Sequence, residues 1–197
     1  MGFSVVFNLL ASVEHYAESH NYLGSKLLWQ GRVQEAIAQY ERALQIQPDS
    51  AEAHFNLGNA LVRVGKIEEA IPHYRQALRL NPDLAEAHYD LAVALSRTGG
   101  LGEAIEQYEQ AVQIKPGFAE AHFNLGNALS RTGKIKEAIP HYEQALRIQP
   151  DFAMAHHNLG IALRDVGRTQ DAIDHFEQAL RITPDNAGAH YNLGVAL

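Results

Sequence analysis

The chain has 197 residues, a formal charge of −7 at neutral pH and no cysteine. The lack of cysteine excludes disulfides, thiolate metal sites and cysteine nucleophiles. The acidic balance argues against a nucleic-acid partner, because proteins that bind phosphate backbones normally carry a basic face. Hydrophobic residues make up 46% of the chain, which is enough to build a core and excludes a wholly disordered protein.

The first segment, residues 1–13, is apolar. Unlike a secretory signal peptide, it has no Lys or Arg before its apolar stretch. We therefore expect residues 1–16 to form an N-terminal apolar capping segment, and we favour this over a targeting segment. Two aromatic residues that follow, Tyr22 and Trp29, would then be covered by residues 3–13. The alternative is that they form an exposed hydrophobic anchor.

From residue 17 onward the sequence repeats with a period of 34 residues. Proline, glycine, alanine and aromatic residues each recur at this interval, as the series Pro48, Pro82, Pro116, Pro150 and Pro184 illustrates. The full units are 17–50, 51–84, 85–118, 119–152 and 153–186, and a partial sixth unit covers 187–197. Such a period predicts a stack of identical supersecondary units.

Each unit predicts two amphipathic helices. With positions numbered 1–34 in a unit, leucine at positions 7 and 11 shares one helical face with alanine at positions 3 and 10. Glycine at position 15 predicts the end of this first helix, and proline at position 32 the end of the second. Because one unit cannot bury its apolar face alone, the units are expected to stack.

The segment AEAHFNLGNAL…GKIEEAIPHYRQALRLNPD (51–83) and its copies resemble the tetratricopeptide repeat over residues 17–197. The resemblance implies an all-α, right-handed α-solenoid of helix-turn-helix units, with the first helices lining a concave groove. One departure is uniform, because position 4, usually Trp in the family, is His in all six units. The resemblance also implies a protein or peptide partner.

Catalytic and metal chemistry find little support in the sequence. The six histidines at position 4 should lie about 10 Å apart from unit to unit, which is too far for one ion. His73, His141 and His175 share position 23, at the edge of the second helix. We therefore expect structural histidines, no metal, no cofactor and no enzymatic activity. The phosphate-loop spacing also fails, since six residues separate Gly126 from Gly133 where four are needed.

The first helix carries a second stripe, opposite its leucines, at positions 2, 5, 6, 9, 12 and 13. Asparagine recurs there, and an amide with donors and an acceptor in every unit can pair with an extended peptide. The NLGN pattern is similar to the repeats of O-linked N-acetylglucosamine transferases, which form an asparagine ladder. The candidate groove residues are Asn56, Asn59, Asn124, Asn127, Asn158, Asn192, Phe55, Tyr89, Phe123, Arg63, Arg97 and Arg131. We expect mostly unpaired amides here, whereas the aromatic residues are equally compatible with packing against a neighbouring helix.

The sequence thus predicts a non-catalytic scaffold that binds an extended partner segment in its groove. The alternatives are the repeat arm of a larger enzyme, such as a glycosyltransferase, and a self-assembling structural protein that forms homo-oligomers through its ends. A cytoplasmic location is expected from the absence of cysteine, and no membrane insertion is expected because no apolar run reaches about 18 residues.

Overall fold

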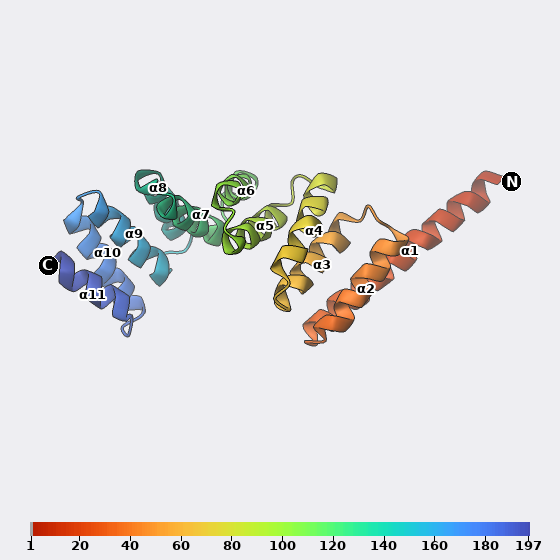
Figure 1. Ribbon diagram of the computed structural model, residues 1–197, viewed down its shortest axis with the longest axis horizontal. Coiled ribbons are helices and arrows are strands. Elements are labelled where there is room, and N and C mark those ends of the chain that lie inside the picture. The colour runs from red at the N-terminus through yellow and green to blue at the C-terminus, as the bar shows by residue number, and fades with distance from the viewer. Residues whose placement is uncertain (1) are drawn as a thin grey trace. The chain divides into compact units, whose positions relative to one another are not determined.

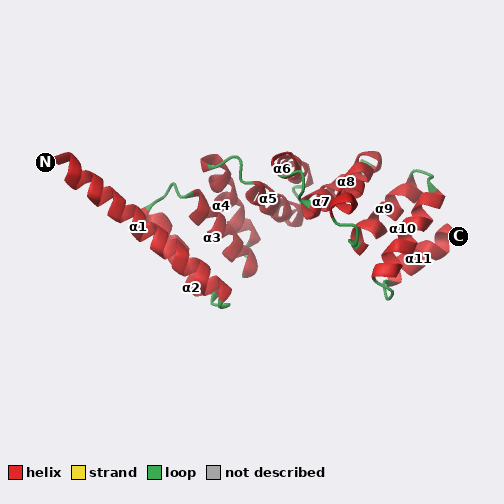
Figure 2. Cartoon of the chain, turned by 180° about the vertical axis from the view of Figure 1, so that it is seen from behind, coloured by secondary structure: helices red, strands yellow, loops and turns green. Residues whose placement is uncertain are grey.

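The computed structural model describes residues 2–197, with side chains from Glu14 onward. The described residues form eleven helices joined by short loops, with no strand among them (Figures 1 and 2). In chain order these are α1 (Gly2–Trp29), α2 (Val33–Ile46), α3 (Ala51–Arg63), α4 (Ile67–Leu80), α5 (Ala85–Thr98), α6 (Leu101–Ile114), α7 (Ala119–Arg131), α8 (Ile135–Ile148), α9 (Ala153–Asp165), α10 (Thr169–Ile182) and α11 (Ala187–Ala196). The all-α class and the helix-turn-helix units are confirmed.

The helices group into two compact units, one ending at Gly99 and the other beginning at Gly100. In the first unit α1 packs on α2, α2 on α3, α3 on α4 and α4 on α5. In the second, each helix from α6 to α10 likewise packs on the helix that follows it in the chain. Each unit is therefore a stack of neighbouring helices with its core between them.

The turn inside each repeat requires glycine. The five glycines at position 15 have φ between 77° and 93°, and the described residues contain no other residue with positive φ. This left-handed conformation closes the first helix and is unfavourable for residues with a Cβ. The predicted helix ends are thus confirmed at the backbone level.

A second glycine allows the two helices of a repeat to approach closely. A Cβ added at Gly58 would lie 2.6 Å from the ring of Tyr74, and a Cβ added at Gly126 would lie 2.6 Å from the ring of Tyr142. Tyr74 is fully buried by this contact. Glycine at position 8 and the aromatic residue at position 24 therefore form the centre of a helical hairpin.

The N-terminal helix differs from the sequence expectation. α1 is one helix from Gly2 to Trp29, and its N-terminal part continues past the end of α2 (Figure 1). Tyr22 is 73% exposed and Trp29 is 89% exposed, so the expectation that residues 3–13 cover them is wrong. A continuous helix cannot fold back on its own later turns. How the side chains of residues 1–13 pack lies outside the described residues.

Among the described residues, no helix combines the length and the hydropathy needed to cross a membrane.

Candidate functional site

The first-helix stripe forms a hollow in the N-terminal unit. This hollow has a volume of about 330 Å³ and is lined by three successive first helices, α1, α3 and α5, together with α4. Its apolar lining includes Leu28, Val62 and Val93, and its polar lining includes the groove candidates Asn56, Asn59, Arg63 and Arg97. The predicted positions 6, 9, 12 and 13 therefore meet around one depression.

An acidic residue contributes to this hollow. Asp90 occupies position 6 of α5, where four other units have Asn. Burial, and secondarily the charge of Glu86, raises the pKa of Asp90 to about 6. Burial also raises the pKa of Tyr74, with a further contribution from the charge of Asp90. The floor of the hollow thus combines a neutral phenol with a carboxyl group that titrates near neutral pH.

The asparagines of the N-terminal unit are hydrogen-bonded to one another and to tyrosine. The Asn56 Nδ2 donates to the Asn21 Oδ1 on the preceding first helix, at 3.0 Å. The Tyr74 hydroxyl donates to the Asn59 Oδ1, at 2.7 Å. Because an amide has two N–H donors and a carbonyl acceptor, each asparagine keeps part of its hydrogen-bonding capacity.

The C-terminal unit repeats this arrangement. The Asn158 Nδ2 donates to the Asn127 Oδ1 at 2.7 Å, and the Tyr142 hydroxyl donates to the same oxygen at 2.9 Å. The Asn192 Nδ2 donates to the His157 Nε2 at 2.9 Å, while Arg164 donates to the Asn192 Oδ1 at 2.8 Å. The expectation of mostly unpaired amides is therefore wrong for Asn56, Asn158 and Asn192, since stacking places each of them within reach of the first helix of the preceding repeat.

The aromatic candidates do not form one exposed set. Phe123 is only 6% exposed and packs on Tyr142 and on Phe152, whose ring centroid lies 4.7 Å away. Of the two roles that the sequence left open for Phe123, the structure shows packing, because Phe152 in the loop between α8 and α9 covers it. Phe55 is half-buried against Tyr74, and Tyr89 is half-buried as well.

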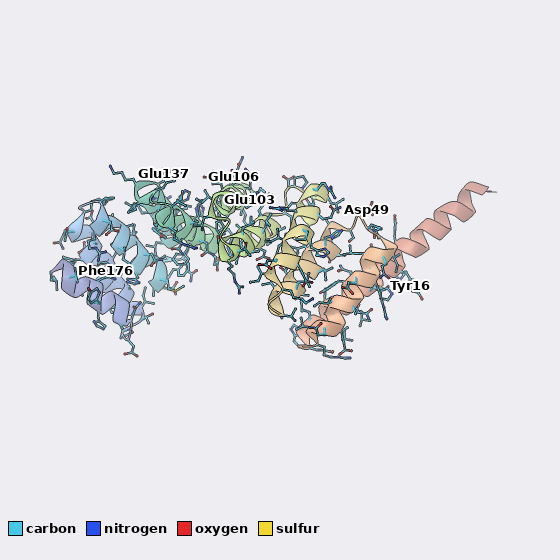
Figure 3. The ribbon with its side chains drawn as sticks, viewed as in Figure 1. Tyr16, Asp49, Glu103, Glu106, Glu137 and Phe176 are labelled. Carbon is cyan, nitrogen blue, oxygen red and sulfur yellow. The ribbon has the colours of Figure 1, made fainter. Side chains whose placement is uncertain are left out.

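The remaining candidates lie on first helices of the two units. Arg63, Arg97 and Arg131 are exposed near the ends of α3, α5 and α7, and Asn124 is half-buried on α7. Outside this stripe, Tyr16 is an exposed aromatic side chain on α1, whereas Phe176 is buried between α9 and α10 (Figure 3). From the hydrophobic pattern alone, the aromatic residues Tyr22 and Trp29 of α1 were expected to be covered by residues 3–13, whereas the structure leaves them exposed.

Histidines form pairs that the sequence pattern did not reveal. The Nδ1 atoms of His54 and His73 lie 3.1 Å apart, and those of His156 and His175 lie 2.9 Å apart. A third pair, His122 and His141, has an Nδ1 separation of 3.4 Å. Each pair joins position 4 of a first helix to position 23 of the second helix in the same repeat. Sequence reasoning compared position 4 only between units and therefore missed this proximity.

Within the described part of the chain, no group of three or more His, Asp or Glu side chains is arranged to hold a metal ion.

Comparison with known families identifies the repeats. A TPR repeat model matches residues 24–65, and a tetratricopeptide repeat model matches residues 55–119, 97–153, 123–187 and 157–197. The chain belongs to the tetratricopeptide repeat family. Its architecture is therefore a tetratricopeptide repeat α-solenoid, and membership supports a protein-interaction role. No curated protein matches the chain.

Solved tetratricopeptide repeat structures share this fold. YrrB, described as a TPR protein with an unusual peptide-binding site, has a TM-score of 0.80 at 24% identity, covering 87% of this chain and 89% of its own. A MamA structure has a TM-score of 0.78 at 27% identity, covering 83% and 96%. MamA 41-end from Desulfovibrio magneticus RS-1 has a TM-score of 0.79 at 20% identity, covering 87% and 97%.

Proposed function

We propose that this tetratricopeptide repeat protein is a non-catalytic interaction module that binds an extended segment of a partner protein along its first helices. The observation that carries the proposal is the hollow over α1, α3 and α5, because equivalent positions of successive repeats line it. A repeated lining suits a ligand that is itself extended and periodic. The peptide-binding site named for YrrB supports the same class of ligand.

The lining indicates which chemistry the bound segment carries. Leu28, Val62 and Val93 offer an apolar contact for one side chain. Arg63 and Arg97 are exposed beside it, so an acidic group next to that side chain would gain charge-assisted hydrogen bonds. The acceptor and donor capacity left on Asn56 and Asn59 is available to peptide groups of the ligand.

Selection from a library of extended peptides tests this proposal. Peptides selected on the intact protein are measured by fluorescence anisotropy against the wild type and against the double variant Arg63→Glu/Arg97→Glu. We expect at least tenfold weaker binding, because two favourable contacts to an acidic group become repulsive.

The matched control is Arg42→Glu/Arg79→Glu, which makes the same charge change on exposed positions of α2 and α4. The control variant should bind the peptide with an affinity within about twofold of the wild type, since dissolved salt screens the interaction between a ligand and distant surface charges. Equal losses in both variants, or a ligand unaffected by the first, would contradict binding at this hollow.

A further inference from the structure

The three histidine pairs share one hydrogen-bonding plan that determines their protonation. The Nε2 of His54 lies 2.9 Å from the carbonyl oxygen of Pro48, and the Nε2 atoms of His122 and His156 face the carbonyls of Pro116 and Pro150 in the same way. A carbonyl only accepts, so each of these Nε2 atoms carries a proton. In the neutral ring the Nδ1 lone pair is then directed at the partner histidine, whose Nδ1–H donates to it.

This plan matches the way proteins orient imidazole ligands for metals. A ligating histidine commonly donates its other ring N–H to a backbone carbonyl, which fixes the tautomer and directs the ligating lone pair. The proline carbonyl at the end of the preceding repeat supplies this orientation for position 4. The partner at position 23 is attached to the facing helix of the same hairpin, so both nitrogens belong to one rigid unit.

The separations fit two nitrogens on one transition-metal ion. Nitrogens that each lie about 2.1 Å from an ion are about 3.0 Å apart at a 90° angle and about 3.4 Å apart at a tetrahedral angle. The Nδ1 separations are 2.9 Å, 3.1 Å and 3.4 Å, with ring centroids 5.2–5.7 Å apart. The two nitrogens of each pair therefore already have the separation that a shared ion requires, and the rings need only turn until both lone pairs point at the ion.

We propose that the pairs His54/His73, His122/His141 and His156/His175 are three two-histidine sites for a divalent late transition metal such as Zn²⁺ or Ni²⁺. Both Nδ1 atoms bind the ion, and water completes its coordination. The position-23 ring loses its Nδ1 proton and takes one up at Nε2, so its net charge does not change. With two protein ligands each, the sites bind weakly and reversibly.

The charges around the pairs are compatible with a bound cation. Burial lowers the pKa of His73, His141 and His175, which keeps these rings neutral and able to ligate at neutral pH. Glu69 lies near His73, and Asp171 and Asp174 lie near His175, while Arg168 acts in the opposite direction there. The chain's charge of −7 favours cations generally.

The repeat itself supplies a variant that removes the sites and keeps the fold. Position 23 is Gln39 in the first repeat, where its Oε1 lies 2.7 Å from the His20 Nδ1. Glutamine therefore occupies this position while bonded to the position-4 histidine. The variant His73→Gln/His141→Gln/His175→Gln places glutamine at position 23 of the three repeats that hold the pairs, where the amide group can donate an N–H to the remaining histidine or accept one from it.

Calorimetric titration of the intact protein with zinc chloride at pH 7.5 tests the proposal. We expect about three ions per chain for the wild type, and at least tenfold weaker binding for the triple variant at equal helicity by circular dichroism. Magnesium chloride, which prefers oxygen ligands, should bind neither protein. Zinc should also raise the unfolding temperature of the wild type alone, because the ion joins the two helices of a hairpin.

The control variant His15→Gln/His190→Gln removes two histidines that have no histidine partner in the described part of the chain, and it should bind zinc like the wild type. The proposal is overturned if the wild type binds no zinc, or if the triple variant binds as many ions with the same affinity. Loss of binding in the control variant alone would likewise place the sites elsewhere.

Discussion

Individual glycines in this protein have opposite roles, and the difference can be read from their surroundings. A Cβ at Gly58 would meet the Tyr74 ring at 2.6 Å, whereas one at Gly102, inside α6, would meet nothing within 4 Å. Both residues lie in helices, so backbone conformation does not separate them. Replacing each of them by alanine should therefore change the free energy of unfolding in opposite directions.

We expect Gly58→Ala to lower the free energy of unfolding by about 1–3 kcal/mol, because the added methyl group overpacks a buried hairpin. Gly102→Ala should raise it by about 0.5–1 kcal/mol, since alanine costs less entropy in an exposed helical site. Urea unfolding of both variants measures this. A Gly58→Ala protein as stable as the wild type would show that the hairpin opens without cost.

Asp90 makes stability depend on pH. Its folded pKa, about 6, lies above the ordinary value near 3.9, so the folded state holds this proton more tightly than the unfolded state. The stability it contributes is therefore full below pH 4 and is lost as pH rises through 6. A shift of about two units corresponds to at most about 3 kcal/mol.

The variant Asp90→Asn should consequently be more stable than the wild type at pH 8 and should lose this advantage at pH 4.5. Asparagine already occupies the same position in four units, so the substitution suits the site. Exposed Asp83→Asn serves as control and should show no such dependence. Urea midpoints at the two pH values decide the matter, and a constant difference between them would contradict a raised pKa.

At the scale of helices and turns, the third repeat has the turn with the most glycines, namely Gly99, Gly100 and Gly102. Thr98 and Thr132 cap their helices identically, each hydroxyl donating to carbonyls of the preceding turn. Beyond them the repeats differ, because Lys134 forms an ion pair with Glu137 at 3.7 Å where the third repeat has Gly100. Gly102 adds further backbone freedom.

We therefore expect faster amide hydrogen exchange in residues 96–104 than in residues 130–138, because extra glycines increase the entropy lost on ordering and solenoids open locally. Hydrogen exchange followed by mass spectrometry compares the two segments within one sample. Gly102→Ala should narrow the difference. Equal protection in the wild type would show that the third repeat is not the weak point.

Helix positions followed closely from the sequence, while side-chain partners did not. The 34-residue period locates each helix because leucine spacing and position-15 glycine act within one unit. The partners of Asn56 and Asn158 depend instead on how closely two first helices stack, which no spacing within a unit encodes. Phe55 and Phe123 have the same neighbours in sequence, yet only Phe123 has an aromatic residue, Phe152, to cover it.

At the scale of the whole molecule, helix α11 has an exposed apolar surface. α11 packs on α10, but Tyr191, Val195 and Leu197 remain exposed. We expect this chain to self-associate at high concentration through α11, because contiguous exposed apolar side chains favour association. In analytical ultracentrifugation, the apparent mass of the wild type should rise with concentration, whereas that of the Val195→Lys/Leu197→Lys variant should stay constant. A wild type that stays monomeric would contradict the expectation.

The bond between each position-4 histidine and the proline carbonyl six residues earlier recurs from His54 to His190. The imidazole Nε2 donates this hydrogen bond whether the ring is neutral or cationic. At the joints between consecutive repeats this hydrogen bond therefore needs only the Nε2 proton, which both forms of the ring carry. An indole N–H is also always a hydrogen-bond donor. Histidine in place of the family's usual tryptophan therefore changes the aromatic ring but keeps an N–H donor at this position.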